Sequence, residues 1–135
     1  MNTPFIYNFN VTHDFELKIT TFFGLEDILA KELLKLGGKN ITPFKRGVAV
    51  TGDIGFLYKC NLCLHTALKV LVPITKFKAD NEHQLYENIK ALPWEQFIDI
   101  NDSIQIESVL NTELFTHSLF VSQKVKDGIV DRFRE

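Results

Sequence analysis

The sequence has no apolar run near the roughly 20 residues that a membrane-spanning helix needs, and its N-terminus lacks the pattern of a secretory signal. Its only two cysteines, Cys60 and Cys63, lie three positions apart. Such a pair provides no disulfide framework, which fits a reducing compartment. We therefore expect a cytoplasmic protein with no membrane partner.

A strong excess of positive charge, the usual sign of a generic nucleic-acid-binding protein, is also missing, since the formal net charge is −2. The charge is unevenly spread, however. Residues 1–79 contain 10 Lys and Arg against 6 Asp and Glu, or +4, while residues 80–135 contain 5 against 11, or −6. With 45% hydrophobic residues the chain can form real cores. The change of charge near residue 80 predicts a domain boundary there.

Between residues 14 and 79, segments whose apolar residues have strand periodicity are interleaved with segments that have helix periodicity. The expected elements are a strand at 15–21, a helix at 24–36, strands at 41–44 and 48–51, a helix from 54 to about 66, and a strand at 68–74. Lys45-Arg46-Gly47 is expected to join the middle strands as a hairpin. This order is that of a ferredoxin-like βαββαβ domain. Its last strand lies at a sheet edge, where Pro73 is tolerated.

The remaining segments predict less complete structure. Residues 1–13 show no clear periodicity and are interpreted as a flexible leader. Residues 80–135 predict a helix around 84–91, an irregular connector at 94–100, a strand at 103–110 and a helix at 119–133. A single strand cannot satisfy its own hydrogen-bonding ladder. We therefore expect an α+β protein whose second unit, 80–135, is the first half of a domain.

Four phrases connect this layout to a known family. They are GLEDILAKEL at 24–33, RGVAVTGD at 46–53, NLCLHTALKV at 61–70 and KVKDGIVD at 124–131. In this order the phrases resemble the N-terminal ferredoxin-like domain and following THUMP domain of 23S ribosomal RNA guanine-N2 methyltransferases. The resemblance implies that 80–135 is the N-terminal half of a THUMP domain, an RNA-binding module.

The resemblance also implies a division of labour in the full-length parent enzyme. This segment would bind structured large-subunit ribosomal RNA, not DNA, and position it for guanine N2 methylation by a catalytic domain further along, with S-adenosylmethionine (SAM) as cofactor. The sequence itself has no glycine-rich cofactor turn and no Asn-Pro-Pro-Tyr stretch. We therefore expect neither catalytic residues nor a bound cofactor in this chain.

Positively charged residues at three places are candidates for RNA contacts. Lys45 and Arg46 at the hairpin tip either contact phosphate groups of RNA or form an ordinary solvent-exposed turn. Lys69 stands where the family tends to have arginine. The last helix has basic residues that nearby Asp127 and Asp131 partly offset, so a solvated face is the alternative there. The candidate RNA-binding residues are Lys45, Arg46, Lys69, Lys124, Lys126 and Arg132.

Two further interpretations compete with RNA binding. Cys60, Cys63 and His65 suit zinc chemically, but no second ligand pair completes a site, so we expect both cysteines to pack in the core. Most of the 12 phenylalanines, which could otherwise stack on bases, are assigned to the cores as well.

The alternative function is a protein-interaction module that pairs the strand at 103–110 with another chain, including a second copy of itself.

Overall fold

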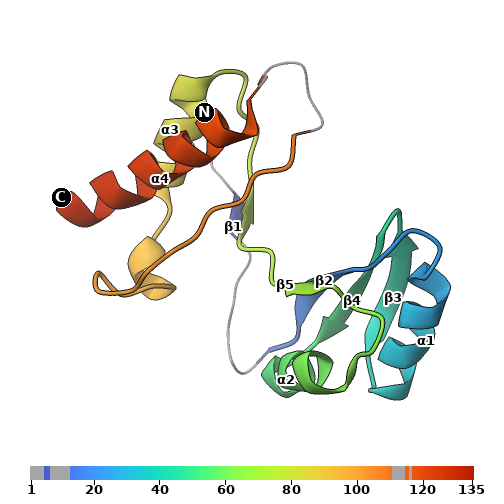
Figure 1. The fold of residues 1–135 in the computed structure, drawn as a ribbon. Helices are drawn as coiled ribbons and strands as arrows, with labels where there is room; N and C mark the ends of the chain where they lie inside the picture. The colour runs from blue at the N-terminus through green and yellow to red at the C-terminus, as the bar shows by residue number, and fades with distance from the viewer. Residues whose placement is uncertain (1–4, 7–12, 111–114, 116) are drawn as a thin grey trace. The chain divides into compact units, whose positions relative to one another are not determined.

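The computed structural model describes residues 5–6, 13–110, 115 and 117–135. The contacts divide the chain into two units, one over Phe5–Lys76 and one that contains Phe77–Glu135 (Figure 1). Each unit has its own hydrophobic core. We describe the two units separately.

The first unit contains a four-stranded antiparallel sheet with two helices. The strands follow the order β3-β4-β2-β5 across the sheet. The bounds are β2 Phe15–Thr20, α1 Glu26–Lys35, β3 Lys39–Phe44, β4 Gly47–Gly52, α2 Ile54–Cys63 and β5 Lys69–Leu71. This is the expected ferredoxin-like order, with β5 at the sheet edge, and it confirms the fold class predicted for this region. Pro73 lies beyond the end of β5, outside the ladder.

The core of the first unit lies between one face of the sheet and the two helices. Leu17 and Ile19 of β2 pair in register with Val50 and Val48 of β4, so their side chains share a face. Buried residues from both helices join the same cluster, which places α1 and α2 on one side of the sheet (Figure 1). The alternating pattern of β2 is therefore explained by burial of its odd-numbered positions.

Local signals in the sequence set the helix ends. Gly37 has a φ of +93°, and Gly38 donates to the carbonyl of Leu33, which closes α1 as predicted. Asp53 caps α2, since its side chain accepts from the backbone N–H of Phe56 at 2.8 Å. The helix ends at Cys63, before the expected end near residue 66, because the next residues turn into a connection toward β5.

The β3–β4 hairpin differs from the prediction in one detail. Its connection has two residues, Lys45 and Arg46, because Gly47 already pairs with Phe44 as the first residue of β4. Arg46, and not Gly47, takes the left-handed conformation, with a φ of 65°. Gly47 is required for space, since a Cβ there would lie 2.4 Å from Cζ of Phe44.

The N-terminal region contains a short strand that the sequence did not predict. β1 Phe5–Ile6 pairs with β6 Thr75–Lys76 as a two-stranded antiparallel ladder. Residues 5–6 are thus tied to a distant part of the chain, which corrects their assignment to a flexible leader. The rest of that predicted leader, apart from residue 13, lies outside the described residues.

The second unit is built on two long helices with a connector between them. Its elements are α3 Glu82–Ala91, the 3₁₀-helix η1 Trp94–Gln96 and α4 Ser118–Arg134. Leu85, Ile89 and Leu92 pack with residues of α4 in one cluster. Gly128 allows the close approach, since a Cβ there would lie 2.9 Å from Cγ2 of Ile89. The helices predicted near 84–91 and 119–133 are therefore confirmed.

The strand predicted at 103–110 is not present. The backbone of residues 103–110 takes part in no ladder, and the described residues of 77–135 include no strand that could pair with it. Instead, Ile106 and Leu110 pack partly against the helix cluster, and Ser108 Oγ lies 2.8 Å from Ser122 Oγ of α4. Period-two alternation shows which side chains are buried, whereas a strand also needs a neighbour for its backbone.

Two adjacent leucines of α1 test the described packing. Leu33 is fully buried, while Leu34 is 67% exposed. We expect Leu33→Ala to lower the free energy of unfolding of the first unit by about 2–5 kcal/mol, because it leaves a cavity. Leu34→Ala should change it by less than about 0.5 kcal/mol. Urea unfolding followed by NMR signals from Phe5–Lys76 measures both, and equal losses would contradict the assignment of the core.

Candidate nucleic-acid interface

Three connections of the first unit meet at one end of its sheet. Thr21, a buried residue just after β2, donates its backbone N–H to the carbonyl of Arg46 at 2.8 Å and its hydroxyl to the carbonyl of Thr66 at 2.6 Å. On the other side, the N–H of Leu68 donates to the carbonyl of Thr20. We call residues 21–25, 45–46 and 64–69 the loop end. Its three parts are joined through Thr21, by a backbone hydrogen bond to Arg46 and a hydroxyl hydrogen bond to Thr66.

Glu26, at the start of α1, holds two parts of the loop end together. Its carboxylate oxygens accept from the backbone N–H of Gly24 at 2.8 Å and from that of Arg46 at 2.9 Å. Hydrogen bonds from backbone N–H groups, including those of Glu26 itself, Arg46 and Gly24, hold the pKa of this carboxyl below its usual value. The ionised carboxylate therefore stabilises the hairpin turn in its left-handed conformation.

Glu32 fixes the third part in the same manner. Its carboxylate accepts from the backbone N–H groups of His65 and Thr66, and from the Thr66 hydroxyl at 2.7 Å. Partial burial acts to raise the pKa of Glu32, but the hydrogen bonds from Thr66 and His65 hold it below the usual value. These bonds also explain why α2 ends at Cys63, before the expected end near residue 66. The backbone N–H groups of His65 and Thr66 donate to Glu32 and do not continue the helix.

The structure brings three of the predicted residues together at the loop end. Lys45 and Arg46 form the hairpin turn, and Lys69 begins β5 opposite Thr20. Thr20 also pairs with Gly47, the residue that follows the hairpin turn. The turn and Lys69 therefore lie on either side of the same end of β2. All three residues are exposed, and the described residues contain no ion pair of Lys45 or Arg46. The loop end therefore presents positive charge to solvent.

Sequence reasoning missed two aromatic residues in this place. Phe22 and Phe23 follow Thr21 in the loop end, and they are 63% and 72% exposed. The sequence-based prediction assigns most of the 12 phenylalanines to cores and singles out neither of these two. Their position in the sequence could have indicated this exposure. Both residues follow the alternating residues of the strand and precede the apolar stripe of the helix, so they belong to a loop.

The predicted residues of α4 have a different environment. Lys126 is exposed, while Lys124 is half-buried, with Nζ 5.7 Å from the ring centroid of Phe120. Lys124 also lines a shallow hollow that contains Glu82, Asp127 and Asp131. The nearby carboxylates weaken the attraction of this surface for phosphate.

Arg132 is engaged inside its own unit. Its Nη2 and Nε donate to the two carboxylate oxygens of Glu95 at 2.8 and 3.1 Å, and its Nη1 donates to the carbonyls of Lys90 and Ala91. This two-point ion pair raises the pKa of Arg132 and lowers that of Glu95. The geometry gives Arg132 a structural part, because it joins α4 to the end of α3 and to η1.

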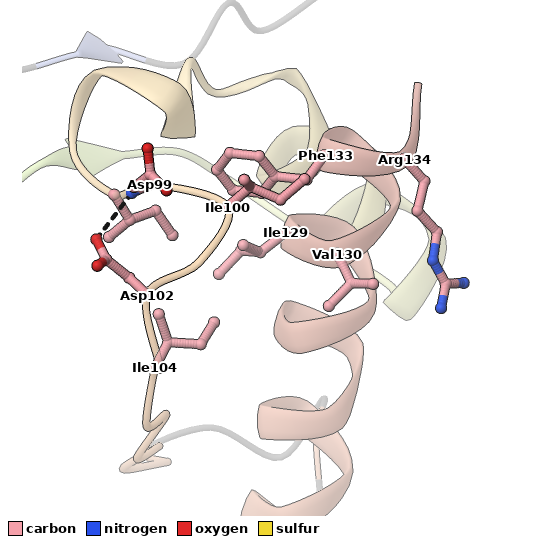
Figure 2. A pocket seen from close by; sticks show the side chains of 9 residues that line it. Asp99, Ile100, Asp102, Ile104, Ile129, Val130, Phe133 and Arg134 are labelled. Atoms are coloured by element: carbon pink, nitrogen blue, oxygen red, sulfur yellow. Dashed lines mark hydrogen bonds between the residues drawn. The ribbon is translucent and has the colours of Figure 1, made fainter.

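The second unit contains a pocket of about 280 Å³. Figure 2 shows Ile100, Ile104, Ile129 and Phe133 around it, with the carboxylates of Asp99 and Asp102 nearby. Arg134 also lines the pocket, but the two carboxylates outnumber it, and the apolar walls offer phosphate no hydrogen bonds. The pocket therefore does not compete with the loop end as a nucleic-acid site.

The structure divides the two cysteines. Cys60 is buried in the core, where desolvation raises the pKa of its thiol to about 11, whereas Cys63 is exposed. The core assignment thus holds for Cys60 and is wrong for Cys63, which lies at the last position of α2. Among the described residues, no three His, Cys, Asp or Glu side chains form a group that could hold a metal. In the same residues, no helix has the length and apolar character to cross a membrane.

The role of Glu26 is testable through pH. Because the pKa of Glu26 is lowered on folding, the stability it contributes is present above the ordinary value of 4.5 and is lost as the pH falls through the lowered pKa. We expect the amide signals of Gly24 and Arg46 to titrate together with a midpoint below 4.5. An NMR titration measures this, and a midpoint at or above 4.5 would contradict the described bonds.

A neighbouring carboxylate supplies the control for this prediction. Glu26→Gln should speed hydrogen exchange of the Arg46 backbone N–H. The glutamine side chain lacks the negative charge that strengthens the hydrogen bond from this N–H. Asp27→Asn removes the same charge from the same helix turn. Since no hydrogen bond joins Asp27 to the hairpin among the described residues, we expect exchange at Arg46 to stay unchanged.

Comparison with known proteins places each unit in a family. Residues 16–71 match the model of the RlmL ferredoxin-like domain, and residues 79–135 match the THUMP domain. Ribosomal RNA large subunit methyltransferase K/L of Syntrophotalea carbinolica is 35% identical over 112 residues, which are 83% of this chain and 16% of that protein. The chain therefore spans about a sixth of that relative.

Solved structures agree with the observed fold. A chain from Listeria monocytogenes, described as a predicted N6-adenine-specific DNA methylase, has a TM-score of 0.79 and 29% identity over 90% of this chain and 32% of its own. SMU.472, described as a methyltransferase and solved with S-adenosylhomocysteine (SAH), has a TM-score of 0.78 and 24% identity, with 90% of this chain and 32% of its own covered. The latter likeness shows the fold alone. Residues 16–71 of this chain thus belong to the RlmL ferredoxin-like domain family, and residues 79–135 belong to the THUMP domain family.

Proposed function

We propose that this chain is the RNA-binding segment of a SAM-dependent ribosomal RNA methyltransferase that acts in the cytoplasm. It binds structured large-subunit ribosomal RNA and positions it for guanine N2 methylation by a catalytic domain outside these residues. The matched THUMP domain and the ribosomal RNA methyltransferase relative support RNA as the partner. The ribosomal RNA methyltransferase relative supports SAM as the methyl donor of the parent enzyme.

The observation that carries this proposal is the convergence of Lys45, Arg46 and Lys69 on the loop end. Phosphate contacts of this kind position a protein on nucleic acid without reading its sequence. Glu26 and Glu32 hold the supporting backbone in place, so little order has to be gained on binding. The loop end therefore serves as the anchor for the RNA backbone.

The protein-interaction alternative is less well supported. It needs residues 103–110 to pair with another chain, whereas Ile106 and Leu110 pack partly against the helix cluster and Ser108 Oγ lies 2.8 Å from Ser122 Oγ of α4. The exposed cations of the loop end favour an anionic partner instead. RNA binding is accordingly the function that the geometry supports best.

Removal of the two turn cations tests the proposal. The variant combines Lys45→Ala with Arg46→Gly, because glycine readily adopts the left-handed backbone at position 46. We expect it to weaken binding of a structured ribosomal RNA fragment several-fold and to reduce the slope of log affinity against log salt by about 2. Fluorescence anisotropy over a salt series measures both quantities on the full 135-residue chain.

A matched variant removes the same charge elsewhere on the first unit. Lys35 ends α1 and Lys59 lines a hollow with Asp14, Gly52 and Asp53, at the other end of the sheet. Lys35→Ala with Lys59→Ala should leave affinity nearly unchanged. Equal losses from both pairs, or equal affinity of the unaltered chain for RNA and for DNA of the same length, would count against the proposal.

A further inference from the structure

Two large apolar side chains stand in solvent at the loop end. Phe22 and Phe23 are 63% and 72% exposed, although both belong to a domain with a well-packed core. A single exposed phenylalanine needs no explanation, but two in succession next to a basic turn form a distinct surface. Their presence suggests a ligand that covers them.

The backbone that carries these rings is fixed on both sides. Before them, Thr21 is buried and hydrogen-bonded to Arg46 and Thr66. After them, the N–H of Leu25 donates to the carbonyl of Phe22 at 3.1 Å, and Gly24 is held by Glu26. The rings are therefore presented from a preorganised loop, which lowers the entropic cost of binding.

The adjacent charges indicate the chemistry of that ligand. The bond from Thr21 to Arg46 brings the turn of Lys45 and Arg46 against the residue that precedes Phe22. A ligand that suits this surface offers flat apolar faces beside negative charge. Unpaired nucleotides do so, because their bases expose π-faces and their backbone carries phosphates, whereas a duplex hides the base faces in its stack.

We propose that Phe22 and Phe23 stack on the bases of unpaired RNA nucleotides while Lys45 and Arg46 contact the flanking phosphates. The inference rests on the proposed RNA-binding function and adds which part of a structured RNA the loop end takes. The chain thus prefers loops, bulges or single-stranded ends to regular helices. The phenylalanines supply this preference, and the cations supply affinity for any RNA.

The test compares two RNAs on the full chain. One is a single-stranded oligouridine of about 12 nucleotides, within the usual range of single-strand sites, and the other is a blunt RNA duplex of equal length. Phe22→Ala with Phe23→Ala should weaken binding of the single strand about tenfold or more and change duplex binding little. Tyr58→Ala, an aromatic change on α2 at the same 63% exposure as Phe22, should alter neither.

Conservative variants separate stacking from general apolar contact. Phe22→Tyr with Phe23→Tyr should keep the preference for the single strand, whereas Phe22→Leu with Phe23→Leu should lose it, because leucine has no π-face. Full affinity of the leucine pair for the single strand would overturn the stacking proposal, because general apolar contact would then be sufficient. Circular dichroism verifies that each variant is folded.

The outcomes distinguish this inference from the proposed function. If the Lys45 and Arg46 variant loses RNA binding while the alanine pair at 22 and 23 does not, the stacking role is wrong and RNA binding at the loop end stands. If neither variant weakens binding, the stacking role and the assignment of RNA binding to the loop end are both wrong.

Discussion

The carboxylate of Glu26 makes the two hydrogen bonds on which the loop end depends. It joins backbone N–H groups that are 22 residues apart in the chain, those of Gly24 and Arg46. Arg46 has a left-handed backbone that a residue with a side chain adopts only at some cost. A charged acceptor is well suited to offset that cost, because its hydrogen bonds are stronger than those of neutral groups.

This constraint explains why basic residues have different roles in the two units. At the loop end Glu26 is occupied by backbone N–H groups, and Glu32 by backbone N–H groups, the Thr66 hydroxyl and the ring of His65. Lys45 and the Arg46 side chain have no anionic partner among the described residues. In the second unit the acidic groups pair with side chains instead, as Glu95 does with Arg132 and Glu135 does with Lys90. Similar residue types are thus exposed to solvent in one unit and hold helices together in the other.

Much of the fold could be predicted from local pattern. The alternation at 15–21, the stripe at 24–36 and the cap at Asp53 each reflect an interaction within a few residues, and the structure contains all three. The strand predicted at 103–110 was wrong because alternation reports burial, while a ladder needs a partner. The strand at Phe5–Ile6 was missed because a strand of two residues is too short to show an alternating pattern, although its backbone does have a partner.

The sequence by itself determined the order of the elements from β2 to β5, the ferredoxin-like class of the first unit and the basic character of residues 45–46, because these depend on periodicity and composition. Only the tertiary structure decided that Lys69 shares one surface with that turn, that Arg132 is held by Glu95, and that Phe22 is exposed. Each of these facts depends on contacts between residues far apart in the chain. Such contacts are set by strand register and helix packing, which no local pattern contains.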